Sequence, residues 1–325
     1  MSTTGSTINI NYTQPNKDFW VNHSAFRNNA SIYVTATRAD MALFTGNSLV
    51  GPGVNNPYNA QVYVSGPTLL ALQSNLFSNY AVSGSVGVGV FAYNTQLVGI
   101  NNIFVNPLYP YNSGEALVVN VPAGQLALMS CNTYANSGPL QLQIAIGGTY
   151  DSTEERFYNS PVYLTGEKGL GGTYVSYDST FFTNRAQNAI SDSLLISTNV
   201  AMELHYDTFT APSFNGYVFG IQVIGANFSD TNSILNNVSV SITGAATKPT
   251  VTLNGTQILG GNLRVTGSKN LPIGLVTIGP KTKIVSGPGG SRISGAGYVQ
   301  GVSVSRKATL IGFTVDSGIP VQVVN

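Results

Sequence analysis

The residues best placed to do chemistry are Glu203, His205 and Asp207, which alternate along one short β-prone segment. Successive side chains of a strand point to opposite faces, so these three would share one face, with Leu204 and Tyr206 on the other. A row of carboxylate, imidazole and carboxylate could orient a general base or bind a cation. The preferred interpretation is a polar, solvent-facing row on a half-buried strand whose Leu204 and Tyr206 face the core.

Metal ligands are scarce. The acidic cluster of Asp151, Glu154 and Glu155 could supply hard oxygen ligands for Ca²⁺, but it lacks the spaced ladder of a dedicated calcium loop. Asp230-Thr231-Asn232 begins such a ladder and then stops. The two histidines stand apart and Cys131 is the only cysteine, which argues against a zinc or redox-metal site. We therefore expect no cofactor, with Ca²⁺ as the one possible ion and a solvated loop as the preferred interpretation.

The glycine-rich segments carry no phosphate-binding or nucleophile motif. Gly84–Gly89 lacks the dinucleotide fingerprint, and Gly166–Thr173 has its lysine in the wrong place for a phosphate loop. Gly287–Arg292 has the composition of a flexible turn. No serine sits in a nucleophile elbow. These absences predict no catalytic residues and no enzyme activity.

Charge is sparse and sorted by position. Residues 1–247 carry twelve acidic and six basic side chains, a net charge of −6, whereas residues 248–325 carry eight basic side chains and one acidic one, a net charge of +7. Such asymmetry indicates an oriented partner or self-assembly. The basic residues expected to form inner-face or inter-subunit contacts are Lys248, Arg264, Lys269, Lys281, Lys283, Arg292, Arg306 and Lys307.

Three partners suit this basic segment. Protein–protein contact within one assembly is the preferred interpretation, because the acidic larger piece offers a complementary surface. The alternatives are that Lys and Arg face the phosphate groups of membrane lipid or of nucleic acid. Only Tyr298 and Phe313 are available there for stacking on bases, which weakens the nucleic-acid alternative.

Composition and periodicity predict an all-β fold. Short segments with period-2 alternation, such as Ser31–Thr37, Thr173–Tyr177 and Ala201–Tyr206, are bounded by Gly, Pro or Asn. Between such segments lie long polar stretches such as Gly46–Asn59, which we expect to be loops.

Domain organisation follows from the change in composition near residue 248. We expect residues 1–247 to form a jelly-roll-type β-sandwich, or two in series with a break near residues 147–160. Residues 248–325 should form a small, basic, Gly-rich β-sandwich or barrel. A few rungs of a β-solenoid are the alternative for this last segment, although its repeat has no fixed period.

The N-terminus shows neither a basic nor an apolar signal region, and no apolar stretch approaches the ~18 residues of a membrane helix. A surface this poor in charge gains little solubility from self-repulsion, which favours packing against copies of itself. Together these features predict a virion structural protein made in the host cytoplasm. It would be a capsid or coat subunit that assembles with itself and with other virion proteins.

Two alternatives remain open. One is a carbohydrate-binding fibre, spike or lectin-like protein that grips host-surface glycans, with Trp20 and surface Tyr and Asn stacking on and hydrogen-bonding to sugar rings. The other is a cell-surface layer or pilus subunit.

Overall fold

Every regular element in the described part of the chain is a short β-strand, and the strands pair side by side in parallel. The computed structural model describes residues 7–12, 18–27, 30–36, 41–51, 59–80, 87–106, 114–167, 171–184, 193–212 and 220–325. Within these ranges no helix is long and apolar enough to cross a lipid bilayer. The chain divides into two compact units, a first unit, Met1–Tyr163, and a second unit, Leu164–Asn325.

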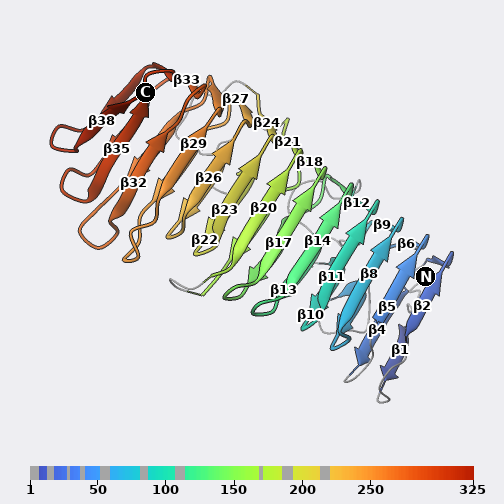
Figure 1. The fold of residues 1–325 in the computed structure, drawn as a ribbon. Coiled ribbons are helices and arrows are strands. Elements are labelled where there is room, and N and C mark those ends of the chain that lie inside the picture. The colour runs from blue at the N-terminus through green and yellow to red at the C-terminus, as the bar shows by residue number, and fades with distance from the viewer. Residues whose placement is uncertain are drawn as a thin grey trace. The chain divides into compact units, whose positions relative to one another are not determined.

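In the first unit, consecutive strands fall in turn into three sheets, A, B and C, so each coil of the chain contributes one strand to each sheet. Figure 1 shows this progression, with neighbouring labels of one sheet three numbers apart. Sheet A contains β1 (Thr7–Tyr12), β4 (Ser31–Ala36), β7 (Ala60–Ser65), β10 (Val88–Tyr93), β13 (Glu115–Val121) and β16 (Leu140–Ile144). Sheet B contains β2 (Phe19–Asn22), β5 (Met41–Thr45), β8 (Leu69–Gln73), β11 (Gln96–Ile100), β14 (Leu126–Ser130) and β17 (Thr149–Thr153). Sheet C contains β3 (Ala25–Phe26), β6 (Ser48–Val50), β9 (Leu76–Ser78), β12 (Ile103–Val105), β15 (Thr133–Ala135) and β18 (Arg156–Tyr158).

The second unit repeats the arrangement, and β19 includes the boundary between the units. Sheet A contains β19 (Val162–Thr165), β22 (Leu195–Thr198), β25 (Ile221–Ile224), β28 (Val240–Thr243), β31 (Leu263–Thr266), β34 (Ser291–Ser294) and β37 (Phe313–Val315). Sheet B contains β20 (Thr173–Tyr177), β23 (Ala201–His205), β26 (Phe228–Thr231), β29 (Val251–Asn254), β32 (Ile273–Ile278), β35 (Val299–Ser305) and β38 (Val321–Val324). Sheet C contains β21 (Thr180–Phe182), β24 (Thr208–Thr210), β27 (Ile234–Asn236), β30 (Gln257–Leu259), β33 (Lys283–Val285) and β36 (Thr309–Ile311).

This topology is a parallel β-solenoid and corrects the expected jelly-roll sandwich and small C-terminal sandwich or barrel. The all-β expectation is confirmed, but a jelly roll needs antiparallel neighbours, whereas each strand here pairs in parallel with the strand three elements later. Period-2 alternation is the same in both folds, since it reports only that one face of each strand is buried. The solenoid considered for residues 248–325 is present there and in both units. The expected division at residue 248 stays a prediction; residues 244–250 connect β28 with β29.

The core is built from stacked identical positions on successive coils. In sheet C of the first unit the inward rings lie 4.7 to 5.1 Å apart and nearly parallel. This separation matches the strand spacing of about 4.8 Å, so each ring packs on the equivalent ring of the next coil. The stacked residues are Phe77, Phe104, Tyr134 and Phe157.

Corners between sheets explain the abundance of asparagine. A single residue with positive φ turns the chain, and asparagine tolerates this left-handed conformation better than other non-glycine residues. Asparagines with φ between 50° and 61° are Asn59, Asn79, Asn94, Asn101, Asn136, Asn159, Asn199, Asn232 and Asn237. Residues 46–59 had been expected to form one loop, but Ser48–Val50 is a strand and Leu49 is fully buried.

An internal asparagine ladder fixes the corner between sheets B and C in the first unit. Asn47, Asn75, Asn102 and Asn132 occupy the same buried position on successive coils. Each side-chain oxygen accepts the backbone N–H and the side-chain N–H of the residue one coil earlier, at 2.7 to 3.0 Å. Glu155 ends the ladder by accepting the same two donors from Asn132. The four ladder amides are thereby hydrogen-bonded, as the low-polarity interior requires.

Neighbouring coils approach so closely at several positions that only glycine fits. Gly287 is one of them. A Cβ there would meet the backbone oxygen of Gly260, and the Gly287 N–H donates to the oxygen of Gly261 at 3.0 Å. We expect Gly287→Ala to lower the free energy of unfolding by about 1–3 kcal/mol, measured by denaturant titration. Gly301→Ala is the control, since its Cβ would meet no atom closer than 3.5 Å. Equal stability of the two variants would contradict this packing.

Candidate binding surface

The outward side chains of β23 are Ala201, Glu203 and His205, on the outer face of sheet B in the second unit. Leu204 is buried, as expected from alternation. The prediction that Tyr206 faces the core and that Asp207 shares a face with Glu203 is wrong. The strand β23 ends at His205, and Tyr206 adopts a φ of 60° at the corner between sheets B and C. Tyr206 is therefore 57% exposed rather than in the core.

Asp207 lies inside the solenoid instead of beside Glu203. It is fully buried, and its Oδ1 accepts the Ser179 N–H at 2.7 Å and the Ser176 hydroxyl at 3.0 Å. Burial raises the pKa of Asp207 to about 7, against the opposing effect of these hydrogen bonds. Burial likewise raises the pKa of Asp230 to about 6. Neither carboxyl reaches solvent, so no carboxylate–imidazole–carboxylate row exists for catalysis.

One end of β23 carries a partly exposed aromatic pair. Tyr177 at the end of β20 stacks on His205, with ring centroids 4.5 Å apart and planes 11° apart. The two residues pair in register on neighbouring strands, and the Tyr177 side chain is 38% exposed. Tyr206 extends the same surface onto the corner. Together these rings form a platform, which we define as Tyr177, His205 and Tyr206.

The other end of β23 borders a groove of about 200 Å³ at the corner between sheets A and B. Its lining contains no charged side chain: Gly171, Asn199, Ala201, Gly225, Ala226, Asn227, Thr247 and Pro249. The Oδ1 of Asn227 accepts the Thr250 N–H at 2.9 Å, which orients the amide at the groove. The small glycine and alanine residues leave the groove open, and the amides of Asn199 and Asn227 supply hydrogen-bond donors and acceptors to it.

The groove and the platform belong to one band across the outer face of sheet B. Ala201 lines the groove and His205 lies in the platform, four residues along the same strand. At about 3.3 Å per residue, their separation is about 13 Å. Glu203 lies between them, exposed, beside Ser229 of β26. Figure 1 shows β20, β23 and β26 as neighbours. We call this surface the sheet B band.

The three acidic residues considered as possible calcium ligands lie in different environments. Glu155 is buried at the end of the asparagine ladder, while Glu154 is exposed and Asp151 faces outward on β17. Burial raises the pKa of Glu155 to about 8, although the two hydrogen bonds from Asn132 oppose the rise. Among the residues that the structure describes, no three His, Cys, Asp or Glu side chains gather as metal ligands.

The eight predicted basic residues do not form a single face. Arg264 and Arg292 point outward from sheet A, and Lys248 and Lys269 lie in connections between sheets A and B. The remaining four lie at or beside the corner between sheets B and C: Lys281, Lys283, Arg306 and Lys307.

Trp20, proposed from sequence as a sugar-stacking residue, is 66% exposed on the outer face of sheet B in the first unit. Its in-register neighbours Leu43 and Ala71 are apolar and partly buried. Three residues of the sheet B band were not predicted from the sequence: Tyr177, Asn199 and Asn227. Their one signal was position, since each stands at or next to a strand end, where corner residues meet the sheet.

Comparison with protein-family models and with curated protein sequences finds no match. Among solved structures, the chain is similar to a crystal structure of a TibC-catalysed, hyper-glycosylated fragment of TibA. The two are 10% identical, with a TM-score of 0.36, over 99% of this chain and 98% of the fragment. So low a TM-score carries no argument about fold or function.

Proposed function

We propose that this chain is a carbohydrate-binding β-solenoid protein of the fibre or spike kind, which binds an oligosaccharide on the sheet B band. The composition of this band is the observation that supports the proposal. The band joins an uncharged, amide-lined groove to a partly exposed aromatic platform, because β23 carries Ala201 at the groove and His205 in the platform. Sugar rings offer apolar C–H faces that stack on aromatic rings and hydroxyl groups that hydrogen-bond to amides. The combination suits a chain of sugar rings better than a charged metabolite.

The dimensions support an oligosaccharide rather than a single sugar. The groove of about 200 Å³ is smaller than the ~300–1,000 Å³ typical of pockets that enclose a small molecule. It would hold one ring, and the platform about 13 Å away would hold another. Glu203 between them would accept hydrogen bonds from ring hydroxyls.

The capsid interpretation loses its basis. It combined the sparse charge and the absence of a visible signal region with an expected jelly-roll fold, and the described strands form a solenoid instead. A solenoid exposes the outer faces of its sheets along the coils, which suits extended binding surfaces.

A glycan array of the full chain tests the proposal. We expect binding to a defined set of oligosaccharides, and Asn227→Asp should weaken it about tenfold at unchanged melting temperature. The substitution keeps the oxygen that accepts from Thr250 but removes the amide donor, which is worth about 1–1.5 kcal/mol. Asn101→Asp, at an exposed corner position in the first unit, is the control. No binding to any glycan on the array, or equal loss in both variants, would contradict the proposal.

A further inference from the structure

Lys281, Lys283, Arg306 and Lys307 gather on two successive coils of the second unit, and we define these four residues as the basic edge. Lys283 pairs in register with Thr309, so Lys281 and Lys307 occupy equivalent corner positions on neighbouring coils. Strands in a sheet are about 4.8 Å apart, which sets the repeat of these two charges. All four side chains are exposed.

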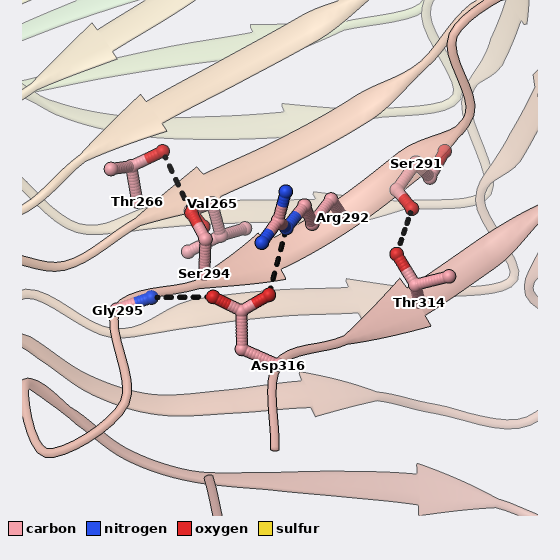
Figure 2. Close-up of polar contacts among 8 residues, drawn as sticks. All are labelled: Val265, Thr266, Ser291, Arg292, Ser294, Gly295, Thr314 and Asp316. Carbon is pink, nitrogen blue, oxygen red and sulfur yellow. Dashed lines mark hydrogen bonds and ion pairs between the residues drawn. The ribbon is translucent and has the colours of Figure 1, made fainter. Parts of the chain in front are cut away.

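The only acidic residue after position 248 is held elsewhere (Figure 2). Asp316 Oδ1 accepts from Arg292 Nε at 2.7 Å, and its Oδ2 accepts from the Gly295 N–H at 3.3 Å. The hydrogen bond from Arg292 lowers the pKa of Asp316, so the carboxylate is ionised and paired on sheet A. Within the described residues, the basic edge therefore has no acidic side chain to neutralise it.

The basic edge continues the corner that carries the aromatic platform. Tyr206, Asn232 and Gly255 take the turning position on successive coils, each donating its backbone N–H to the next coil. Lys281 takes this position on the coil after Gly255, with a φ of 62°. Four strand spacings separate β23 from β35, a length of about 19 Å. The corner between sheets B and C therefore carries Tyr206 of the platform, then the neutral Asn232, and then the four cations of the basic edge.

We propose that the basic edge binds the anionic groups of a linear acidic polysaccharide that lies along this corner and whose uncharged rings reach the platform. The proposal rests on the proposed function and specifies its substrate class. Lys and Arg hydrogen-bond sulfate and carboxylate oxygens through charge-assisted contacts. Charges repeated once per coil suit a polymer with regularly repeated anionic groups.

Nucleic acid fits the basic edge less well. Single strands bind proteins through bases stacked on aromatic side chains beside a basic groove. The two lysine-bearing corners carry no aromatic residue, since residues 279–285 and 305–311 contain none.

Immobilised dextran sulfate and uncharged dextran, with the full chain in solution, test the inference. The edge variant is Lys281→Gln with Lys307→Gln, and its matched control is Arg264→Gln with Lys269→Gln, which removes the same charge from sheet A and from the connection that follows β31. We expect binding to dextran sulfate that weakens with added salt, a loss of about tenfold in the edge variant, and a change within about twofold in the control. Melting temperatures of all variants should match the parent.

Equal losses in the two variants would overturn the inference, because they would report non-specific attraction. Tighter binding to a single-stranded oligothymidylate than to dextran sulfate at equal salt would overturn it in favour of nucleic acid. Failure of the parent to bind dextran sulfate, together with binding of a neutral oligosaccharide that depends on Tyr177, would preserve the proposed function while rejecting the basic edge.

Discussion

Replacing Asn102 by leucine is expected to lower the free energy of unfolding by about 3–5 kcal/mol. The Asn102 side chain accepts from the N–H and the Nδ2 of Asn75, and its own Nδ2 donates to Leu72 O and Asn132 Oδ1, at 2.9 to 3.0 Å. Leucine fills the space but leaves the buried Asn75 N–H and the Leu72 carbonyl without these partners. Each unsatisfied group costs about 1–3 kcal/mol.

Chemical denaturation of the parent and two variants measures this loss. The control is Asn101→Gly, because Asn101 is exposed and has a φ of 57°, a conformation that glycine adopts freely. We expect Asn101→Gly to stay within about 0.5 kcal/mol of the parent. If Asn102→Leu proved as stable as Asn101→Gly, the ladder would not hold the B–C corner together.

Stability is expected to fall as pH rises from about 4 to 8, unlike that of a protein whose carboxylates are paired with cations. Burial raises the pKa of Glu155 to about 8, of Asp207 to about 7 and of Asp230 to about 6, from ordinary values of 4.5 and 3.8. Below the ordinary pKa these carboxyls are protonated in both states. Between its ordinary and its raised pKa, each carboxyl binds the proton only in the folded state. Over that range each group lowers the free energy of unfolding by about 1 kcal/mol per pH unit.

Melting temperatures between pH 5 and 9 check the direction. Glu155→Gln should raise the melting temperature at pH 9, change it little at pH 5 and flatten the profile, because it keeps an acceptor for Asn132 without a charge. Asp178→Asn, at an exposed position of the equivalent corner in the second unit, should leave the profile unchanged. A melting temperature that increases with pH in the parent would contradict the buried-carboxyl account.

Local alternation was readable from the sequence because it depends only on neighbouring residues. Thr173–Tyr177 coincides with β20, and Ala201–Tyr206 overlaps β23. The way in which strands combine was not readable, since sandwich and solenoid strands share period-2 burial. The solenoid repeat was hidden by variable coil length: successive ladder residues are 28, 27, 30 and 23 positions apart.

Corners account for the errors at the candidate site. A strand extended from His205 through Asp207 would keep Glu203, His205 and Asp207 on one face. The left-handed turn at Tyr206 instead sends Asp207 inward and leaves Tyr206 exposed. A positive φ in tyrosine has no sequence signal, because the residue rarely adopts it. The groove at Asn227 depends on residues from several coils and could not be derived from any one segment.

Calorimetric titration with the oligosaccharide selected on a glycan array tests the binding surface most directly. The decisive pair is Tyr177→Ala and Trp20→Ala, which remove exposed rings from sheet B in the second and first units, respectively. We predict that Tyr177→Ala weakens binding at least about tenfold, since ring stacking is worth about 0.5–1.5 kcal/mol beyond the area it buries. Trp20→Ala should bind like the parent. Full binding by Tyr177→Ala, or loss of binding in Trp20→Ala alone, would contradict the assignment of the sheet B band.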